Sequence, residues 1–317
     1  MITDEKSLFI NRHSLPEAYL EQASKWFDPI IESVSLHQKS TNKPLVLGIN
    51  GCQGSGKTTL ADYFSTMLKS HGLKSIAMSI DDFYLTCQQR KKLSADVHPL
   101  LATRGVPGTH DIPLALTTIN ALKNSHDNVS IPRFDKSRDD RFPVEKWPKV
   151  QAPIDVIIIE GWCMGIEAQE GQALVQSVNQ LESLYDAGGT WRDYVNQQIN
   201  LSYKKLWDQM DCLIMLQAPD FDCVYHWRLE QEQNLANKHK LAKRPTSNKI
   251  MSADQIRHFI QHYERLTRHS LIHLPKRCQH VFKLNTKRLI MSHHSPLSTY
   301  FHQSVDTSHT LNTGERS

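Results

Sequence analysis

A glycine-rich segment at residues 51–58 has the composition of a phosphate-binding loop. It reads Gly-Cys-Gln-Gly-Ser-Gly-Lys-Thr and fits the Walker A pattern G-x-x-x-x-G-K-[ST] at every position. Glycines let successive backbone N–H groups curl around a phosphate, and the start of a following helix adds partial positive charge. In such a loop Lys57 reaches the β- and γ-phosphates and the Thr58 hydroxyl ligates Mg²⁺. The residues expected to bind the nucleotide are Gly51, Cys52, Gln53, Gly54, Ser55, Gly56, Lys57, Thr58 and Thr59.

Two acidic residues follow a second apolar segment. Residues 75–80 lead directly into Asp81 and Asp82. In an open α/β sheet, ligands bind beyond the carboxyl ends of the strands, where a carboxylate beside the γ-phosphate accepts the proton of an attacking hydroxyl. Alternatively, Asp82 caps the next helix and Asp81 is a turn residue. The residues alone leave both interpretations open.

A third acid ends the most apolar run of the chain. Residues 155–159 lead into Glu160, and an apolar strand that ends in an acid is the Walker B pattern. We therefore expect Glu160 to hold Mg²⁺, directly or through water, together with Thr58. The alternative is an isolated turn at the end of a strand.

Two segments between these motifs are dense in Gly, Pro and charged residues. Residues 104–111 and 131–138 are both predicted to be loops. Loops on a rigid scaffold often carry binding residues, and arginine pairs with carboxylates and phosphates through two parallel bonds. These loops therefore suit a small acidic acceptor, although charge alone favours ordinary solvated loops.

Alternating strands and helices are predicted to position these motifs. Apolar runs at residues 45–49, 75–80, 156–159, 212–216 and 281–284 are typical of buried parallel strands. Helical spacing predicts helices at residues 16–37, 59–70, 112–123, 191–209, 221–237 and 253–269. This alternation predicts an α/β fold with a mostly parallel sheet that helices cover on both faces.

Composition excludes several classes of protein. The chain has 317 residues, enough for one or two domains, and a net charge of +4 is too small to indicate nucleic-acid binding. No apolar run approaches the length of a membrane span, and the N-terminus lacks a signal-peptide pattern. The six cysteines form no Cys-x-x-Cys pair, which indicates reduced thiols in a cytoplasmic protein. Cys52 is expected to be a small residue that fits its loop, with redox sensitivity as the alternative.

The motifs together resemble those of the D-glycerate 3-kinase family. The resemblance rests on the Walker A loop, Ser79-Ile80-Asp81-Asp82-Phe83-Tyr84, Arg104-Gly105-x-Pro107-Gly108-Thr109-His110-Asp111 and Glu160-Gly161-Trp162, in this order. That family is similar to uridine kinase, phosphoribulokinase and bacterial pantothenate kinase. The resemblance covers roughly residues 40–290 and implies a P-loop three-layer αβα fold with a lid.

The resemblance also implies roles for individual residues. Asp81 matches the family's catalytic aspartate and is favoured over Asp82 as the general base, with Lys57 as the second catalytic residue. Arg228 matches a lid arginine that reaches the ATP phosphates. The acceptor pocket is expected to include Tyr84, Arg104, His110, Asp111 and Arg133, with Arg104 the first candidate for a carboxylate clamp and Arg133 the second.

The chain is predicted to have three parts, of which the resemblance covers the middle one. Residues 1–40 are expected to be a helical extension, residues 41–290 the kinase domain, and residues 291–317, rich in Ser, Thr and His, a disordered tail. The lid is expected at about residues 226–250, which carry Arg228, Lys238, Lys240, Lys243, Arg244 and Lys249. This segment lacks the short Gly-Pro turn expected of plant members, and Gly165-Ile166 stands where Gly-Phe is expected.

These observations predict a cytoplasmic small-molecule kinase that uses ATP and Mg²⁺, with D-glycerate as the acceptor. No nucleic acid or membrane is expected as a partner, and the sequence does not specify an oligomeric state. One alternative is a kinase of the same fold that acts on pantothenate or a nucleoside. Others are an ATP-binding regulatory protein without transferase activity and a nucleic-acid-associated ATPase, which the mild charge disfavours.

Overall fold

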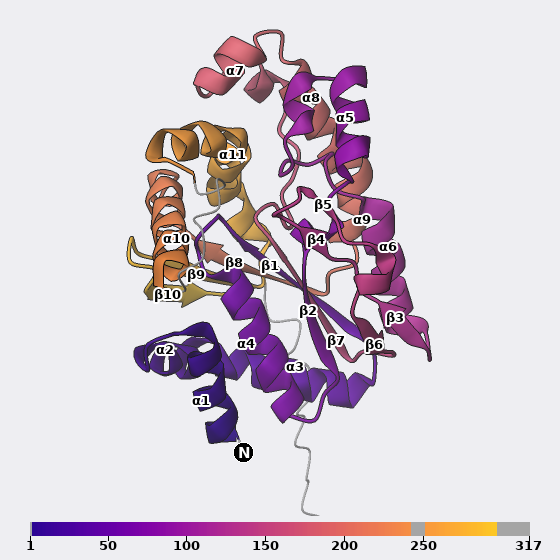
Figure 1. Ribbon diagram of the computed structural model, residues 1–317. Coiled ribbons are helices and arrows are strands. Elements are labelled where there is room, and N and C mark those ends of the chain that lie inside the picture. The colour runs from indigo at the N-terminus through magenta and orange to yellow at the C-terminus, as the bar shows by residue number, and fades with distance from the viewer. Residues whose placement is uncertain (1, 242–250, 297–317) are drawn as a thin grey trace, which may run out of the picture.

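The apolar runs of the sequence form a central sheet. In the computed structural model, which describes residues 2–241 and 251–296, its strands lie in the order β10-β9-β8-β1-β7-β2 (Figure 1). They are β1 Leu45–Gly51, β2 Ser75–Ser79, β7 Val156–Gly161, β8 Cys212–Gln217, β9 His280–Leu284 and β10 Ile290–His294. All neighbours pair in parallel except β10, which is antiparallel to β9. Because β1 lies between β8 and β7, the glycine-rich loop that follows it lies at the carboxyl end of a central strand of the sheet.

Helices cover both faces of this sheet, as strands that are apolar along their length require. Val46 of β1 belongs to a buried cluster that includes α6 and α8, whereas its neighbour Leu47 belongs to a second cluster that includes α3, α4 and α10. The helices are α1 Ile2–His13, α2 Ala18–Trp26, α3 Asp28–Thr41, α4 Lys57–Ser70, α5 Cys87–Asp96, α6 Ile112–Asn124, α7 Gln180–Tyr185, α8 Thr190–Gln198, α9 Lys204–Trp207, α10 Asp222–Leu241 and α11 Ala253–His273. The predicted three-layer αβα fold with a mostly parallel sheet is thus confirmed. Among the described helices, none has both the length and the apolar character that a membrane crossing requires.

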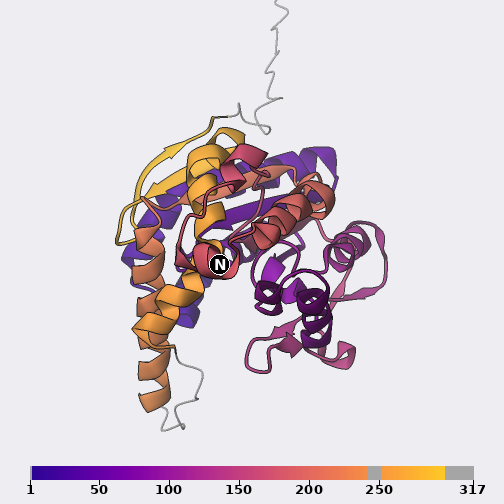
Figure 2. The same cartoon turned by 90° about the horizontal axis from the view of Figure 1, so that it is seen from above.

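The chain between β2 and β7 builds a smaller segment beside the sheet. It begins with a short 3₁₀ helix, η1 (Ile80–Phe83), and contains two antiparallel pairs. These pairs are β3 Asn128–Ser130 with β6 Lys149–Gln151, and β4 Phe134–Asp135 with β5 Asp140–Arg141. Figure 2 shows two groups of elements that extend beyond the sheet. One is α5 with the β4–β5 pair, and the other, on the opposite side, is α10 with α11, which contact each other.

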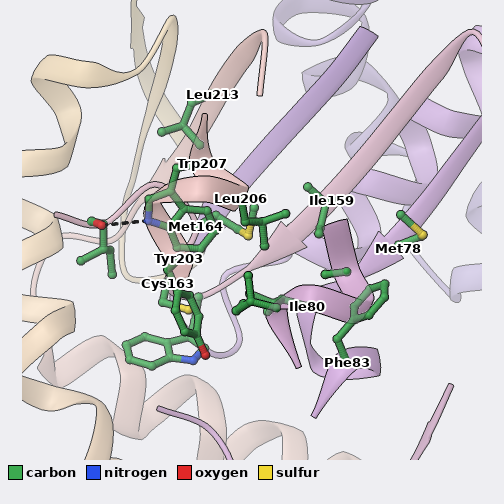
Figure 3. Close-up of a cluster of buried hydrophobic side chains, with 14 of the residues drawn as sticks. Met78, Ile80, Phe83, Ile159, Cys163, Met164, Tyr203, Leu206, Trp207 and Leu213 are labelled. Carbon is green, nitrogen blue, oxygen red and sulfur yellow. Dashed lines mark hydrogen bonds between the residues drawn. The ribbon is translucent and has the colours of Figure 1, made fainter. Parts of the chain in front are cut away.

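A buried hydrophobic cluster supports η1 from beneath. Ile80 and Phe83 pack in one cluster with Met78 of β2, Ile159 of β7 and Tyr203 (Figure 3). Both η1 side chains are fully buried. Asp81 and Asp82 lie between these two anchors, so the packing fixes the backbone that carries both acids.

The N-terminal prediction was wrong in its boundaries. A single helix at residues 16–37 was predicted, but the chain breaks at Phe27 into α2 and α3, and α1 precedes them. Pro29 lies in the first turn of α3, where its fixed φ favours the start of a new helix. The N-terminal helices pack into the same buried cluster as α4, with the Phe9 and Tyr63 rings 5.1 Å apart.

The prediction of a disordered tail from Met291 was also wrong for its first residues. Residues 290–294 form β10 at the edge of the sheet, and the His293 ring stacks on Phe282 at 4.6 Å. Main-chain pairing with β9 drives this strand, and the polar composition of the segment does not reveal it. Residues 297–317, the rest of the predicted tail, lie outside the described residues.

Candidate active site

The glycine-rich segment forms a tight loop between β1 and α4. Gly54 and Gly56 have φ values of +79° and +96°, in the left-handed region that favours glycine. Space also excludes a side chain at Gly54, because a Cβ there would lie 2.6 Å from the Cβ of Trp227 on α10. Arg288 donates a hydrogen bond from Nε to the Gly54 carbonyl at 2.7 Å. The loop is therefore held from outside, and α4 begins at Lys57 directly after it.

Cys52 within this loop is a buried thiol. Burial raises the pKa of Cys52 to about 12, and the nearby charge of Lys57 only partly opposes that rise. The thiol is therefore protonated at neutral pH, which disfavours the redox-sensitive alternative.

Glu160, at the end of β7, meets the first turn of α4. The Thr58 hydroxyl donates to Glu160 Oε1 at 2.8 Å, and Lys57 Nζ lies 3.9 Å from Glu160 Oε2. Glu160 is 3% exposed, and its Oε2 has no hydrogen-bond partner among the described residues. A buried carboxylate oxygen without a partner, next to a hydroxyl, is a set of hard oxygen donors that fits Mg²⁺.

Asp81 lies at the carboxyl end of β2 and accepts one hydrogen bond on each carboxylate oxygen. The Tyr84 hydroxyl donates to Oδ1 at 2.8 Å, and Lys136 Nζ donates to Oδ2 at 2.7 Å. Burial opposes ionisation of Asp81, but the charge and hydrogen bond of Lys136, with a further contribution from Lys57, outweigh it and lower the pKa of Asp81. Asp81 is therefore an ionised carboxylate that faces the phosphate-binding loop.

Asp82, the second acid of η1, is bound to the β4 segment. Its carboxylate accepts hydrogen bonds from Arg133 at 2.9 Å and from the Phe134 backbone N–H at 3.3 Å. Burial raises the pKa of Asp82, and Arg133 opposes that rise. The alternative in which Asp82 caps the next helix is wrong, because Thr86 caps α5 in a capping box with Gln89. Asp82 instead anchors the β4 segment to η1.

These groups line one cavity of about 350 Å³. Its cationic side chains are Lys57, Arg104, Lys136 and Arg228. An aromatic wall completes the cavity: it consists of Tyr84, which was expected in the acceptor pocket, and of Trp162, Phe259 and Tyr263, which were not. The remaining lining residues are Gln53, Gly54, Thr58, Ser79, Asp81, Asp82, Glu160 and Gln231.

Arg104 is held rigidly at the cavity. Its guanidinium pairs with Asp139 and lies 5.4 Å from the centre of the Phe134 ring. Asp139 is held in turn by the buried Arg90, which donates to its carboxylate at 2.6 Å and to its carbonyl at 2.9 Å. Arg104 therefore has a fixed position and orientation, as a clamp for an anionic group requires.

The loop that carries Arg104 depends on Gly105. Gly105 has a φ of +138°, and a Cβ there would lie 2.2 Å from the Tyr263 hydroxyl and 2.8 Å from two ring carbons. We expect Gly105→Ala to lower the free energy of unfolding by roughly 2–4 kcal/mol, because strain and overcrowding add. Gly72→Ala is the matched control, since Gly72 also has a positive φ but nothing within 4 Å. Denaturant unfolding measures both, and equal effects would show that contact with Tyr263 does not restrict residue 105.

Three predicted acceptor residues do not line the cavity. Arg133 pairs with Asp82, and Asp111 caps α6 at the Leu114 N–H and accepts from Arg141 at 3.1 Å. His110 is buried, with its ring stacked on Tyr84 and Nδ1 2.5 Å from the Tyr203 hydroxyl. Burial lowers the pKa of His110 to about 4, so the ring is neutral. His110, Arg133 and Asp111 therefore contact Tyr84, Asp82 and Arg141, respectively, and not the cavity.

Arg228 extends from α10 to the cavity. It pairs with Glu232, which is 4% exposed and also accepts from the Met251 N–H at 3.3 Å. This contact ties α10 to the segment before α11. The other basic residues of the predicted lid, Lys238, Lys240, Lys243, Arg244 and Lys249, have side chains outside the described residues.

A second hollow opens on the other side of the loop. It has a volume of about 530 Å³ and includes Ser55, Gly56 and Thr59. Tyr19 and Gln22 of α2, and Leu289 of the β9–β10 turn, form other parts of its wall. Among the residues expected to bind nucleotide, Thr59 therefore lines this second hollow, whereas Lys57 and Thr58 line the first cavity.

Lys136 and Tyr263 are the main site residues that sequence reasoning missed. Lys136 lies in a segment that was already recognised as a charged loop, but nothing in the sequence pairs it with Asp81. Tyr263 lies on α11, 159 residues after Arg104. The Tyr263 hydroxyl donates a hydrogen bond to the Arg104 carbonyl at 3.4 Å. Trp162 directly follows the Walker B strand, and its Nε1 donates to the Gly105 carbonyl at 2.9 Å.

Comparison with known proteins identifies several relatives. A sequence profile described as the Phosphoribulokinase / Uridine kinase family matches residues 46–181. The chain is 32% identical over 250 residues to the uncharacterized kinase mug58 of Schizosaccharomyces pombe, covering 74% of this chain and 84% of that protein. It is 31% identical over 230 residues to the chloroplastic D-glycerate 3-kinase of Arabidopsis thaliana, covering 69% of this chain and 46% of that longer protein. The solved structure of a D-glycerate 3-kinase from Cryptococcus neoformans var. grubii is similar, with a TM-score of 0.66, 32% identity, and coverage of 84% and 96%.

Proposed function

Because the chain belongs to the phosphoribulokinase and uridine kinase family of P-loop kinases, within the group that includes D-glycerate 3-kinases, we propose that it phosphorylates D-glycerate with ATP. One observation carries the proposal. The rigid Arg104 and the cation Lys136 line the same small cavity as Asp81 and the phosphate-binding loop. A small hydroxy acid has a carboxylate for such cations and a hydroxyl for Asp81. The neutral base and sugar of a nucleoside have no comparable anionic group for Arg104.

The two hollows beside the loop suit the two halves of ATP. The loop backbone, Lys57 and the start of α4 would bind the phosphates, and Arg228 would add positive charge from α10. The second hollow would take the nucleoside, since Gly56 and Thr59 belong both to its wall and to the phosphate-binding turn. In this arrangement the γ-phosphate points toward the first cavity.

Thr58 and Glu160 would hold Mg²⁺ in this site. When bound there, Mg²⁺ supplies positive charge that offsets the charge on the β- and γ-phosphates. Lys57 already lies 3.9 Å from the free oxygen of Glu160, so the charges of the carboxylate, the metal and the lysine would compensate one another.

The transfer itself needs little chemistry from the protein. The acceptor hydroxyl gives its proton to Asp81 as its oxygen forms a bond to the γ-phosphorus. The bond between that phosphorus and the β–γ bridging oxygen breaks, and ADP leaves with the electron pair. Asp81 then releases the proton to water. Positioning by Arg104 and the loop, and charge stabilisation by Lys57 and Arg228, supply most of the rate enhancement.

ADP release in the presence of single acceptors tests the proposal. We expect kcat/KM for D-glycerate to exceed that for pantothenate and for uridine. A preference for either of the latter would restrict the assignment to a P-loop kinase of another acceptor. No acceptor-dependent ADP release with any of them would instead favour an ATP-binding regulatory role.

Arg104→Lys tests the clamp directly. The variant keeps the charge but loses the guanidinium fork, and a charge-assisted hydrogen bond contributes about 1.5–3 kcal/mol. We therefore expect the KM for D-glycerate to rise by about 10-fold or more, with the KM for ATP little changed. Arg133→Lys is the matched control, because Arg133 pairs with Asp82 and does not itself line the cavity. Unchanged acceptor constants in Arg104→Lys would place the clamp elsewhere.

A further inference from the structure

The ion pair between Lys136 and Asp81 raises a question about the reaction. Asp81 must accept a hydrogen bond from the acceptor hydroxyl, but Tyr84 already donates one to its Oδ1 and Lys136 one to its Oδ2, so only one lone pair on each oxygen is left. An ammonium group on Oδ2 also withdraws negative charge from the carboxylate that must attract the proton. A resting site in which Lys136 stays on Asp81 is therefore poorly prepared for proton transfer.

Lys136 differs from the other cations of the cavity in its exposure. Its side chain is 62% exposed, whereas that of Lys57 is 17% exposed. Arg104 is fixed by Asp139 and Phe134, and Arg228 is paired with the buried Glu232. Lysine also carries its charge on a flexible stem, so rotation about its side-chain bonds can carry the ammonium group from Asp81 to a nearby anion.

The backbone beneath Lys136 is fixed, so movement is confined to the side chain. Asp135 Oδ1 accepts from the Ser137 N–H at 2.9 Å and from the Ser137 hydroxyl at 2.6 Å. Asp139, at the other end of the turn, is held by the buried Arg90. The turn between β4 and β5 thus places an exposed cation at the edge of the cavity that the fixed cation Arg104 also lines.

We propose that Lys136 is a specificity switch that leaves Asp81 for the carboxylate of an anionic acceptor, so that only an anionic hydroxy acid frees the base. The inference rests on the proposed function. A neutral polyol offers Lys136 no competing anion, so the ammonium group stays on Asp81 and the hydroxyl is not activated. D-glycerate and glycerol differ mainly in this carboxylate, which makes them a matched pair of acceptors.

Lys136→Gln tests the switch through the ratio of kcat/KM for D-glycerate to that for glycerol. We expect the D-glycerate value to fall by about 10–150-fold, the equivalent of one charge-assisted hydrogen bond of about 1.5–3 kcal/mol. The glycerol value should stay constant or rise, because Asp81 is no longer held. Lys136→Arg should keep much of the preference, since it restores a cation. Arg138→Gln, an exposed cation on the same turn that does not line the cavity, is the control and should leave both values unchanged.

The pH profile provides a second measurement that a purely structural role would not change. The titratable groups that act on or contact Asp81 are Lys57, Asp82, Tyr84, His110, Lys136, Cys163 and Tyr263. Lys136 is the strongest of those that lower the pKa of Asp81, so in Lys136→Gln burial raises that pKa. The acid limb of kcat/KM should therefore move to higher pH in this variant and stay in place in Arg138→Gln.

Two results would overturn the switch. One is an equal loss for D-glycerate and glycerol in Lys136→Gln, and the other is no change for either acceptor. Failure of the proposed function is a separate result, seen in the wild-type protein as a preference for another acceptor. If that acceptor is anionic, the ratio of kcat/KM values is measured with it and with its neutral analogue. If that acceptor is neutral, such as uridine, the proposal that Lys136 acts as a specificity switch is also wrong.

Discussion

Replacing Lys57 by alanine is expected to lower kcat by about 10²–10³-fold, the typical cost of removing one preorganised group that stabilises charge in a transition state. Lys57 begins α4 directly after the loop and lies 3.9 Å from Glu160, so its ammonium group is directed at the place where phosphates and a metal would meet. The same change should weaken ATP binding, because it removes a charge-assisted hydrogen bond of about 1.5–3 kcal/mol. Steady-state kinetics with ATP and D-glycerate, and calorimetric titration of ATP, measure both effects.

Lys69→Ala provides the control for this experiment. Lys69 lies exposed in the last turn of the same helix, so its removal should leave both kcat and ATP affinity unchanged. Thermal unfolding of both variants separates loss of function from loss of fold. If Lys57→Ala turns over ATP as fast as the wild-type protein, the glycine-rich loop is not the active site.

Asp81→Asn should lower kcat by about 10²–10⁴-fold, the usual contribution of a general base, with ATP binding nearly unchanged. The amide keeps the shape of the side chain and a hydrogen bond to Tyr84, but it does not accept the acceptor's proton. The packing of Ile80 and Phe83 beneath it stays intact, so the fold should be preserved. Single-turnover measurements of phosphoryl transfer isolate this step from product release.

Asp82→Asn is the matched comparison, one residue away on the same 3₁₀ helix. It removes the charge that pairs with Arg133, a contact that orders the β4 segment outside the reacting groups. We expect a much smaller loss of turnover than in Asp81→Asn. Equal losses, or a larger loss at Asp82, would reverse the roles assigned to the two acids.

The strands and the phosphate-binding loop could be predicted from sequence because their signals are local. Each predicted sheet strand is a short apolar run, and each is found within a few residues of its expected position. Gly54 and Gly56 adopt the left-handed backbone that the Walker A pattern requires. Glu160 meets Thr58 because β1 and β7 are adjacent parallel strands, and a Walker B strand beside a Walker A strand is a pattern that the sequence carries.

The acceptor side could be predicted only in part, because its contacts join segments that are distant in the chain. Arg104 lines the cavity, but Asp139 and Arg90, which fix it there, carried no signal of that role. Arg133 is also an arginine in a charged loop, as Arg104 is, but its guanidinium binds Asp82. The aromatic wall includes Tyr263 from α11, whose arrival above Gly105 follows from the tertiary packing of that helix. The strand β10 was missed for a different reason: it is close to β9 in the chain, but its pairing with β9 does not depend on apolar side chains.

The identity of the phosphorylated product is the decisive measurement for the proposed D-glycerate kinase activity. The wild-type protein is incubated with ATP, Mg²⁺ and an equimolar mixture of D-glycerate, glycerol, pantothenate and uridine, and the products are identified by mass spectrometry and ³¹P NMR. We expect 3-phospho-D-glycerate as the dominant product, formed together with an equal amount of ADP. Dominant phosphorylation of uridine, pantothenate or glycerol, or ADP formation without any phosphorylated acceptor, would contradict the proposed activity.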